Sequence, residues 1–117
     1  MRLLKRFYHA FSGLYFLIRR EQSFRLHLVL FGMLVACSFY FELNKYEWIA
    51  VLICSSMVFA LEAVNSSIEQ LANRLHPEKH EQIKWVKDMA AAAVLIAALF
   101  SVGVALVIFL PKLGIFS

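Results

Sequence analysis

The sequence contains little glycine and no glycine-rich phosphate-binding motif. Its four glycines are scattered along 117 residues, and neither GxxxxGK[ST] nor GxGxxG occurs. Both motifs need clustered glycines so that the backbone can approach phosphate groups closely. If the chain binds a nucleotide, we therefore expect it to do so without a familiar nucleotide-binding fold.

Cysteine is also scarce, and no metal-binding pattern is present. The two cysteines, Cys37 and Cys54, lie inside separate apolar runs without CxxC or zinc-ligand spacing. His76 and His80 are four residues apart, but Pro77 between them interrupts the helix on which they would share a face. We expect the cysteines to pack as small side chains and the histidines to lie in a solvated loop.

Charged residues make up only 17% of the chain, whereas hydrophobic residues make up 62%. Soluble domains usually contain about 45 to 50% apolar residues, so this composition indicates a membrane protein. The net charge of +4 does not indicate a nucleic-acid partner, because the basic residues flank apolar runs and form no mixed basic and aromatic patch. We expect residues 1–117 to form a single membrane domain that binds no nucleic acid.

The hydrophobic pattern predicts an all-α membrane protein with three transmembrane helices and an N-terminal amphipathic surface helix. Residues 2–20 carry apolar side chains at intervals of three and four, with basic residues opposite. This pattern is typical of a helix that lies flat in the headgroup layer of a bilayer. Three later stretches are apolar enough to span a bilayer. The first is somewhat short for the hydrocarbon core, but tilt can extend it, and the other two are long enough. They comprise about residues 26–41, 46–70 and 88–110.

Polar segments separate the predicted spans. Residues 42–45 read as a tight turn, and residues 77–83 read as a polar connection. We expect the last helix to begin near Lys84. Because proline removes a backbone hydrogen bond, we expect Pro111 to end that helix.

Basic residues are concentrated on one side of the predicted membrane. Six of them lie in the N-terminal segment up to Arg25 and four lie between residues 74 and 87, whereas the other side has only Lys45 and Lys112. By the positive-inside rule, the N-terminus and the connection after the second span are cytoplasmic.

Two carboxylates and an amide emerge from the apolar part of the second predicted span. On a 3.6-residue period, one helical face carries Glu62, Asn65, Ser66 and Glu69. Measured from the interfacial residue Trp48, Glu62 lies roughly 20 Å along the helix and Glu69 roughly 30 Å, so the first lies in the inner leaflet and the second at the cytoplasmic interface. Ionisable residues at membrane depth are costly and by default indicate a functional site.

A carboxylate at this boundary can reach both a lipid headgroup and a water-soluble anionic cofactor. Phosphorylation of a lipid alcohol needs both, together with a base, carboxylates for Mg²⁺ and a cationic side chain for the phosphates. Glu62 is the deeper acid and fits the base. Glu69 and Glu21, at the interface, fit the metal, and Lys87 fits the phosphates.

Three other interpretations are open at this point. Glu62 and Glu69 could pair with basic residues purely for packing. In a proton- or ion-coupled transporter these two carboxylates would relay protons, but a relay needs a route to the outer face, where only Glu42 and Glu47 occur. A non-enzymatic assembly subunit would not need Lys87 at the entrance of the last helix.

Three blocks of the sequence resemble one family. The segment from Glu62 to Glu69 resembles the E-x-x-N-[ST]-[AS]-I-E signature of the small prokaryotic diacylglycerol kinases and the related undecaprenol kinases. His80 followed by residues 87–95 is similar to that family's H-x-x-x-x-x-x-K-D-x-x-[AS]-[AG]-A-V-L, and residues 21–25 resemble its E-x-x-F-R. The blocks occur in the family's order and span nearly the whole chain, so the resemblance is specific.

The resemblance implies a homotrimer in the bacterial inner membrane, with active sites between subunits, that transfers the γ-phosphate of MgATP to diacylglycerol or undecaprenol. It implies that Glu62 is the proton acceptor and that Glu21 and Glu69 bind Mg²⁺. The ATP site implied by matching positions comprises Arg2, His9, Glu21, Asn65, Glu69, Glu78, Lys79, His80, Lys87 and Asp88. The implied lipid site comprises Phe24, Arg25, His27, Glu62 and Ala91.

The sequence departs from the family pattern at two positions. Asn73 stands where the family usually carries an Asp, and His9 stands where one branch has a Tyr. The segment Phe24-Arg25-Leu26-His27 is closer to the F-R-I-H of the undecaprenol kinases than to the diacylglycerol kinase branch, which has an acid at the last position. This similarity favours a polyprenol acceptor without excluding diacylglycerol.

Overall fold

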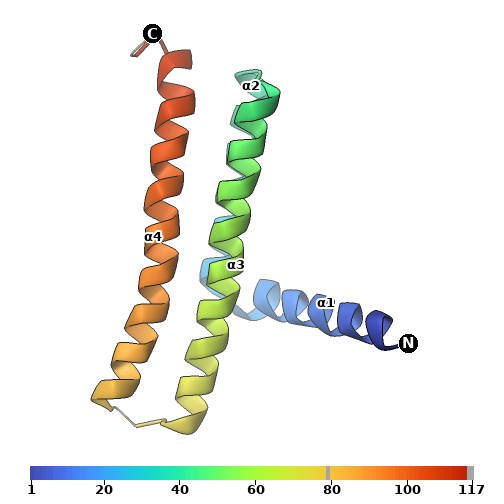
Figure 1. Ribbon diagram of the computed structural model, residues 1–117, viewed down its shortest axis with the longest axis vertical. Coiled ribbons are helices and arrows are strands. Elements are labelled where there is room, and N and C mark those ends of the chain that lie inside the picture. Colours follow the sequence, from blue (N-terminus) through green and yellow to red (C-terminus); the bar gives the residue numbers. More distant parts are fainter. Residues whose placement is uncertain (79, 116–117) are drawn as a thin grey trace.

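The computed structural model describes residues 1–78 and 80–115, and these residues form four helices joined by short turns (Figure 1). Three of the helices are long and apolar enough to cross a membrane. The predicted all-α architecture, with three candidate spans and an N-terminal helix, is therefore confirmed. The helices are α1 (Arg2–Arg20), α2 (Gln22–Tyr40), α3 (Lys45–Leu75) and α4 (Glu81–Lys112).

Helix α1 leaves the bundle sideways. In Figure 1 it runs across the direction of α3 and α4, and its N-terminus lies far from them. None of its residues is buried, and large apolar side chains such as Phe7 and Phe11 are exposed. The chain bends at Glu21, whose extended backbone separates α1 from α2. An exposed amphipathic helix set across the bundle suits the predicted position in the headgroup layer.

Arg25 holds the corner between α1 and α2. Its Nη1 donates hydrogen bonds to the carbonyl oxygens of Ile18, at 3.1 Å, and Arg19, at 2.7 Å. These carbonyls belong to the last turn of α1, where a helix has no internal donors left. Arg25, which the family resemblance assigns to the lipid site, therefore also ties the surface helix to the first candidate span.

The turn between α2 and α3 closes one end of the bundle. The Asn44 side chain accepts a hydrogen bond from the Glu47 N–H, and the Glu47 carboxylate accepts one from the Asn44 N–H, which makes a capping box at the start of α3. Lys112 at the end of α4 forms an ion pair of 3.2 Å with Glu47. The buried apolar cluster at this end comprises Leu43, Val51 and Ile108.

Helices α3 and α4 lie side by side and are joined at the opposite end by a short connection (Figure 1). The predicted start of the last helix near Lys84 is wrong, because α4 begins at Glu81. The His80 side chain accepts a hydrogen bond from the Gln82 N–H at 3.2 Å and so caps the helix three residues earlier than expected. His76 caps the end of α3, so both histidines flank the connection.

Pro111 does not end α4, contrary to the prediction. The fixed φ of proline is compatible with a helix, and within the last turn its missing N–H removes only one backbone hydrogen bond. The helix continues to Lys112, and Leu113 is its C-cap. Gly114, the next residue, adopts a left-handed φ of 83°. The N–H groups of Gly114 and Ile115 then bond to the carbonyls of Pro111 and Leu110, as in a Schellman motif.

Candidate active site

A buried carboxylate on α3 is the centre of the candidate site. Glu62 is 4% exposed, although it lies on a helix that is otherwise apolar around this depth. The Nδ1 of His27 on α2 is hydrogen-bonded to Glu62 Oε2. A buried carboxylate without a partner would be strongly destabilising. The contact with His27 therefore explains how α3 can carry an acid into the packed face of the bundle.

Aromatic side chains pack between α2 and α3 in the same part of the bundle. Phe24 is 4% exposed, and its ring packs against Phe59 of α3 with centroids 5.4 Å apart. Phe31 of α2 also packs against Phe59, with ring centroids 5.6 Å apart. These contacts set how α2 is turned about its axis relative to α3, and that rotation points His27 at Glu62. A contact between Phe24 and the lipid stays a prediction.

The polar face of α3 continues from Glu62 toward the C-terminal end of the helix. Ser66 is buried, and Asn65 Nδ2 donates a long hydrogen bond of 3.5 Å to Glu69 Oε1. The Asn65 Oδ1 atom is buried and has no hydrogen-bond partner among the described residues. A buried acceptor without a donor is costly, so this oxygen lacks a partner that a donor or a cation of a bound molecule could supply.

Glu21, at the bend between α1 and α2, also reaches α3. Its Oε1 accepts a hydrogen bond of 3.5 Å from Gln70 Nε2, which is next to Glu69 in the sequence. In the part of the chain that the structure describes, no three His, Cys, Asp or Glu side chains gather as a metal site. Mg²⁺ is commonly held by one or two protein carboxylates together with water and substrate phosphates. That Glu21 and Glu69 bind a metal that arrives with a nucleotide stays a prediction.

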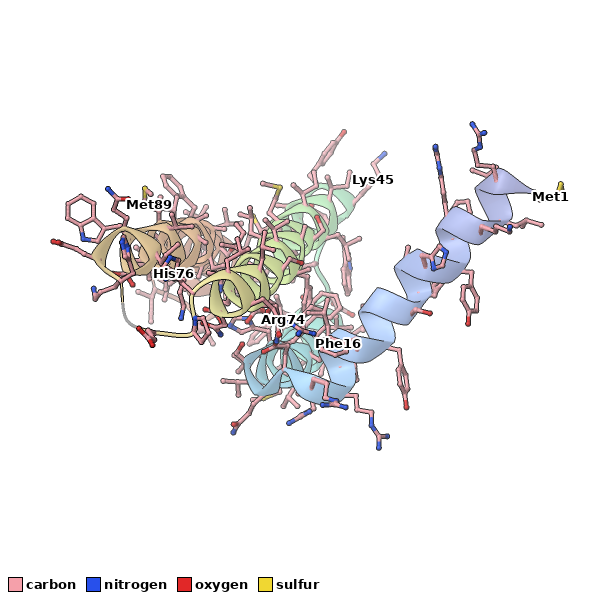
Figure 2. All side chains as sticks on the ribbon, turned by 90° about the horizontal axis from the view of Figure 1, so that it is seen from below. Met1, Phe16, Lys45, Arg74, His76 and Met89 are labelled. Carbon is pink, nitrogen blue, oxygen red and sulfur yellow. The ribbon has the colours of Figure 1, made fainter. Side chains whose placement is uncertain are left out.

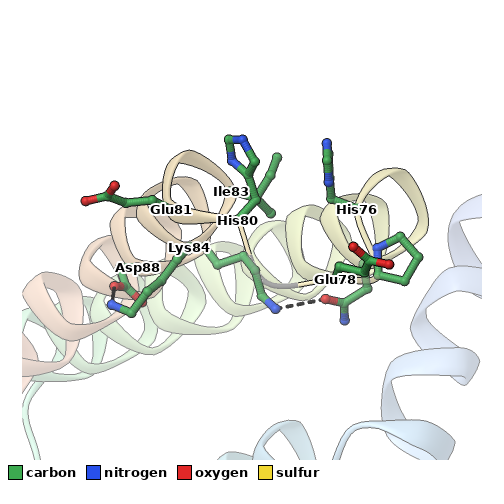
Figure 3. A pocket seen from close by; sticks show the side chains of 10 residues that line it. His76, Glu78, His80, Glu81, Ile83, Lys84 and Asp88 are labelled. Atoms are coloured by element: carbon green, nitrogen blue, oxygen red, sulfur yellow. Dashed lines mark hydrogen bonds and ion pairs between the residues drawn. The ribbon is translucent and has the colours of Figure 1, made fainter.

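A pocket of about 530 Å³ lies where α3, the connection and α4 meet (Figure 3). Lys87 Nζ donates a hydrogen bond of 2.8 Å to Asn73 Oδ1, and Lys84 forms an ion pair of 2.7 Å with Asp88. Lys84 and Asp88 are both exposed, so their pairing contributes little stability. The predicted ATP-site residues that line this pocket are Glu78, His80, Lys87 and Asp88. The predicted Lys79 lies outside the described residues.

A groove of about 260 Å³ lies among α2, α3 and α4. Its wall on α2 is a single helical face, with side chains at the spacing i, i+3, i+4 and i+7, and His27 is the first of them. The other lining residues are apolar or small, including Ser55 and Ser101. One end of an apolar groove therefore lies at the partner of Glu62. The α2 wall comprises His27, Leu30, Phe31 and Leu34.

Three predicted site residues are exposed in the single chain and have no hydrogen bond or ion pair with this centre among the described residues. Arg2 and His9 are exposed on α1, and Figure 2 shows the neighbouring Met1 far from the bundle, whereas Phe16 lies close to it. The His9 ring contacts the adjacent Tyr8, with centroids 5.6 Å apart. Ala91 is exposed on α4. The hydrogen bonds and ion pairs of the described residues do not link these three positions to Glu62.

Sequence reasoning did not find several polar partners in the site. Gln70, the partner of Glu21, and Lys84, the partner of Asp88, were assigned no role. Asn73 was noted only as a departure from a family pattern, although it accepts the hydrogen bond of Lys87. The spacing of four residues between Lys84 and Asp88 could have indicated their pairing on one helix. No signal in one sequence identifies the other two pairs, because each depends on how two separate segments pack together.

Comparison with known proteins identifies the family. Residues 8–109 match the prokaryotic diacylglycerol kinase family. The chain is 35% identical over 112 residues to the undecaprenol kinase of Bacillus subtilis strain 168, an alignment that covers 96% of this chain and 91% of the relative. It is 32% identical to the diacylglycerol kinase of Haemophilus influenzae, over 76% of this chain and 75% of the relative.

A second diacylglycerol kinase, from Escherichia coli K12, is 30% identical over 103 residues, which cover 86% of this chain and 83% of the relative. All three relatives are lipid kinases by name, so the transporter interpretation is not favoured. Because the family match covers most of the helical bundle, the chain belongs to the prokaryotic diacylglycerol kinase family of membrane lipid kinases.

Proposed function

We propose that this protein transfers the γ-phosphate of MgATP to the hydroxyl group of a membrane lipid, with Glu62 as the proton acceptor. One observation carries the proposal. The carboxylate of Glu62 is buried and is hydrogen-bonded to His27, which lines an apolar groove. From Glu62 the polar face of α3 continues to Glu69. A lipid hydroxyl and a water-soluble nucleotide can both reach such a carboxylate.

In the proposed reaction the lipid oxygen attacks the γ-phosphorus of ATP. A bond forms between these two atoms while the bond from the γ-phosphorus to the β,γ-bridging oxygen breaks, and ADP leaves with that electron pair. The proton of the lipid hydroxyl passes to a carboxylate oxygen of Glu62. General-base assistance of this kind contributes about 10²- to 10⁴-fold to a rate.

Glu21 and Glu69 would hold Mg²⁺, whose positive charge neutralises phosphate oxygens during transfer. The orphaned Asn65 Oδ1 beside Glu69 supports a bound polar group at this position. Lys87 would bind phosphate oxygens from the cytoplasmic pocket. The pocket residue Asn73 is four positions beyond Glu69 on α3, which corresponds to a rise of roughly 6 Å.

The remaining ATP contacts would come from the connection and from α1. The structure supports a place for the nucleotide because Glu78, His80, Lys87 and Asp88 line one pocket. Arg2 and His9 lie on the part of α1 that projects away from the bundle. We propose that they reach the site of a neighbouring copy in a homotrimer, because in a single chain they lie apart from Glu62.

We propose undecaprenol as the preferred acceptor and diacylglycerol as the alternative. The undecaprenol kinase relative is more similar to this chain, over more of both sequences, than the two diacylglycerol kinases compared above. The segment from Phe24 to His27 gives further support, because it is closer to the F-R-I-H of the undecaprenol kinases than to the diacylglycerol kinase branch. Its last residue, His27, lines the apolar groove. The protein would act at the cytoplasmic face of the bacterial inner membrane, with its N-terminus in the cytoplasm, in agreement with its basic residues.

Purified protein in mixed micelles, with γ-labelled ATP and Mg²⁺, tests the proposal. Undecaprenol and diacylglycerol are offered in separate reactions and together. We expect label in undecaprenyl phosphate, with less or none in phosphatidic acid. Label in phosphatidic acid alone would contradict the choice of acceptor, and no labelled lipid with either alcohol would contradict the kinase reaction.

A further inference from the structure

We propose that His27 is a positioning residue for the proton acceptor: it holds one oxygen of Glu62 so that the other faces the lipid hydroxyl. The inference rests on the proposed function and adds to it a residue on α2 with a defined role. It starts from the only side-chain hydrogen bond that Glu62 makes within residues 1–78 and 80–115.

The contact fixes a flexible side chain. A glutamate side chain rotates about three torsions, so its carboxylate can take up many positions. A misplacement of a catalytic group by about 1 Å can lower a rate about 10²-fold. The bond joins Glu62 Oε2 and His27 Nδ1. An ionised carboxylate can only accept, so with Glu62 ready to act as a base, His27 donates through Nδ1–H. Burial of the Glu62 side chain, which is 5% exposed, limits competition from water for this bond, whereas His27 is half-buried with 28% of its side chain exposed.

The second oxygen of Glu62 remains available. Its Oε1 has no hydrogen-bond partner among the described residues, and this atom is not completely buried. A reactant can therefore approach Oε1 while His27 occupies Oε2. This division of the two oxygens is what a proton acceptor needs when an alcohol has to be oriented before transfer.

The groove supplies the direction from which the alcohol arrives. His27 lines the groove together with Leu30, Phe31 and Leu34 of the same helical face. An apolar chain that lies along this face ends at the imidazole of His27, and the next polar group beyond the imidazole is Glu62. The hydroxyl at the end of a lipid chain is thus brought to the carboxylate that His27 holds.

Two substitutions separate positioning from simple space filling. In His27→Asn the side-chain amide replaces Nδ1–H with another N–H donor at nearly the same distance from the backbone. In His27→Leu the volume is largely kept but the donor is lost. A control variant, Cys37→Leu, places leucine at an exposed position of the same helix.

We expect His27→Leu to lower kcat for lipid phosphorylation about 10- to 100-fold, with little change in the KM for MgATP. His27→Asn should recover most of the loss, and Cys37→Leu should match the wild type. Thermal unfolding in detergent and binding of a fluorescent ATP analogue show whether each variant is folded.

Full kcat in a folded His27→Leu variant would overturn the positioning role, as would equal losses in the Leu and Asn variants. If His27→Leu does not fold, the Asn variant decides alone: near-wild-type kcat supports the role and a large loss overturns it. These outcomes are distinct from a failure of the proposed function, in which the wild-type protein itself labels no lipid.

Discussion

Lys87 of α4 donates a hydrogen bond of 2.8 Å to Asn73 Oδ1 of α3 and so bridges the two helices at the pocket that both residues line. Loss of this acceptor should weaken the junction between the helices. We expect Asn73→Ala to destabilise the protein by about 0.5–1.5 kcal/mol, as measured by chemical or thermal unfolding in detergent. Asn73→Asp keeps an acceptor for Lys87 and should remain near wild-type stability. Equal stability of the wild type and Asn73→Ala would contradict this role.

Lys87 itself is expected to bind phosphate. Lys87→Met removes a charge-assisted contact, and such contacts contribute about 1.5–3 kcal/mol, so the KM for MgATP should rise about 10- to 100-fold. The KM for the lipid should change little. Lys45→Met removes a lysine at the other end of the bundle and serves as the matched control. An unchanged KM for MgATP in Lys87→Met would exclude a phosphate contact.

Glu21 and Glu69 are expected to bind Mg²⁺ carried by the nucleotide. Because affinity for divalent cations depends on the number of charged oxygen ligands, Glu69→Gln or Glu21→Gln should raise the Mg²⁺ concentration for half-maximal activity about tenfold or more. High Mg²⁺ should restore part of the activity. Glu42→Gln, at the turn between α2 and α3, should leave the titration unchanged. A wild-type Mg²⁺ titration in both site variants would exclude them as ligands.

Sites shared between subunits can be tested by mixing. Arg2 and His9 lie on a helix that leaves the bundle, so they are expected to complete the site of another copy. An Arg2→Ala/His9→Ala variant and a Glu62→Gln variant should each be impaired. When the two are unfolded, mixed and reassembled, activity should rise above the average of the separate proteins. Activity equal to that average would indicate that each site is built from one chain.

Much of the architecture follows from local patterns that a single sequence displays. The amphipathic period of residues 2–20 and the three apolar stretches predict four helices, and the face that carries Glu62 and Glu69 follows from helical geometry alone. The error at Pro111 has a local cause too. A proline in the last turn costs one hydrogen bond, whereas Gly114 in a left-handed conformation supplies the end of the helix.

The contacts that make the site could not be predicted in the same way. The bond between His27 and Glu62 depends on how α2 is turned about its axis, which the packing of Phe24 and Phe31 on Phe59 decides. The bond between Lys87 and Asn73 depends on the register of α4 against α3. Both are tertiary relationships, and neither helix carries a sequence signal for its own rotation or offset.

The rate of label transfer from ATP to lipid by Glu62→Gln tests the central claim most directly. The variant keeps the size of the side chain and removes its ability to accept a proton. If Glu62 is the proton acceptor, kcat falls by about 10²- to 10⁴-fold, while the unfolding temperature and the affinity for an ATP analogue stay close to wild type. Wild-type kcat in a folded Glu62→Gln protein would show that another group receives the proton.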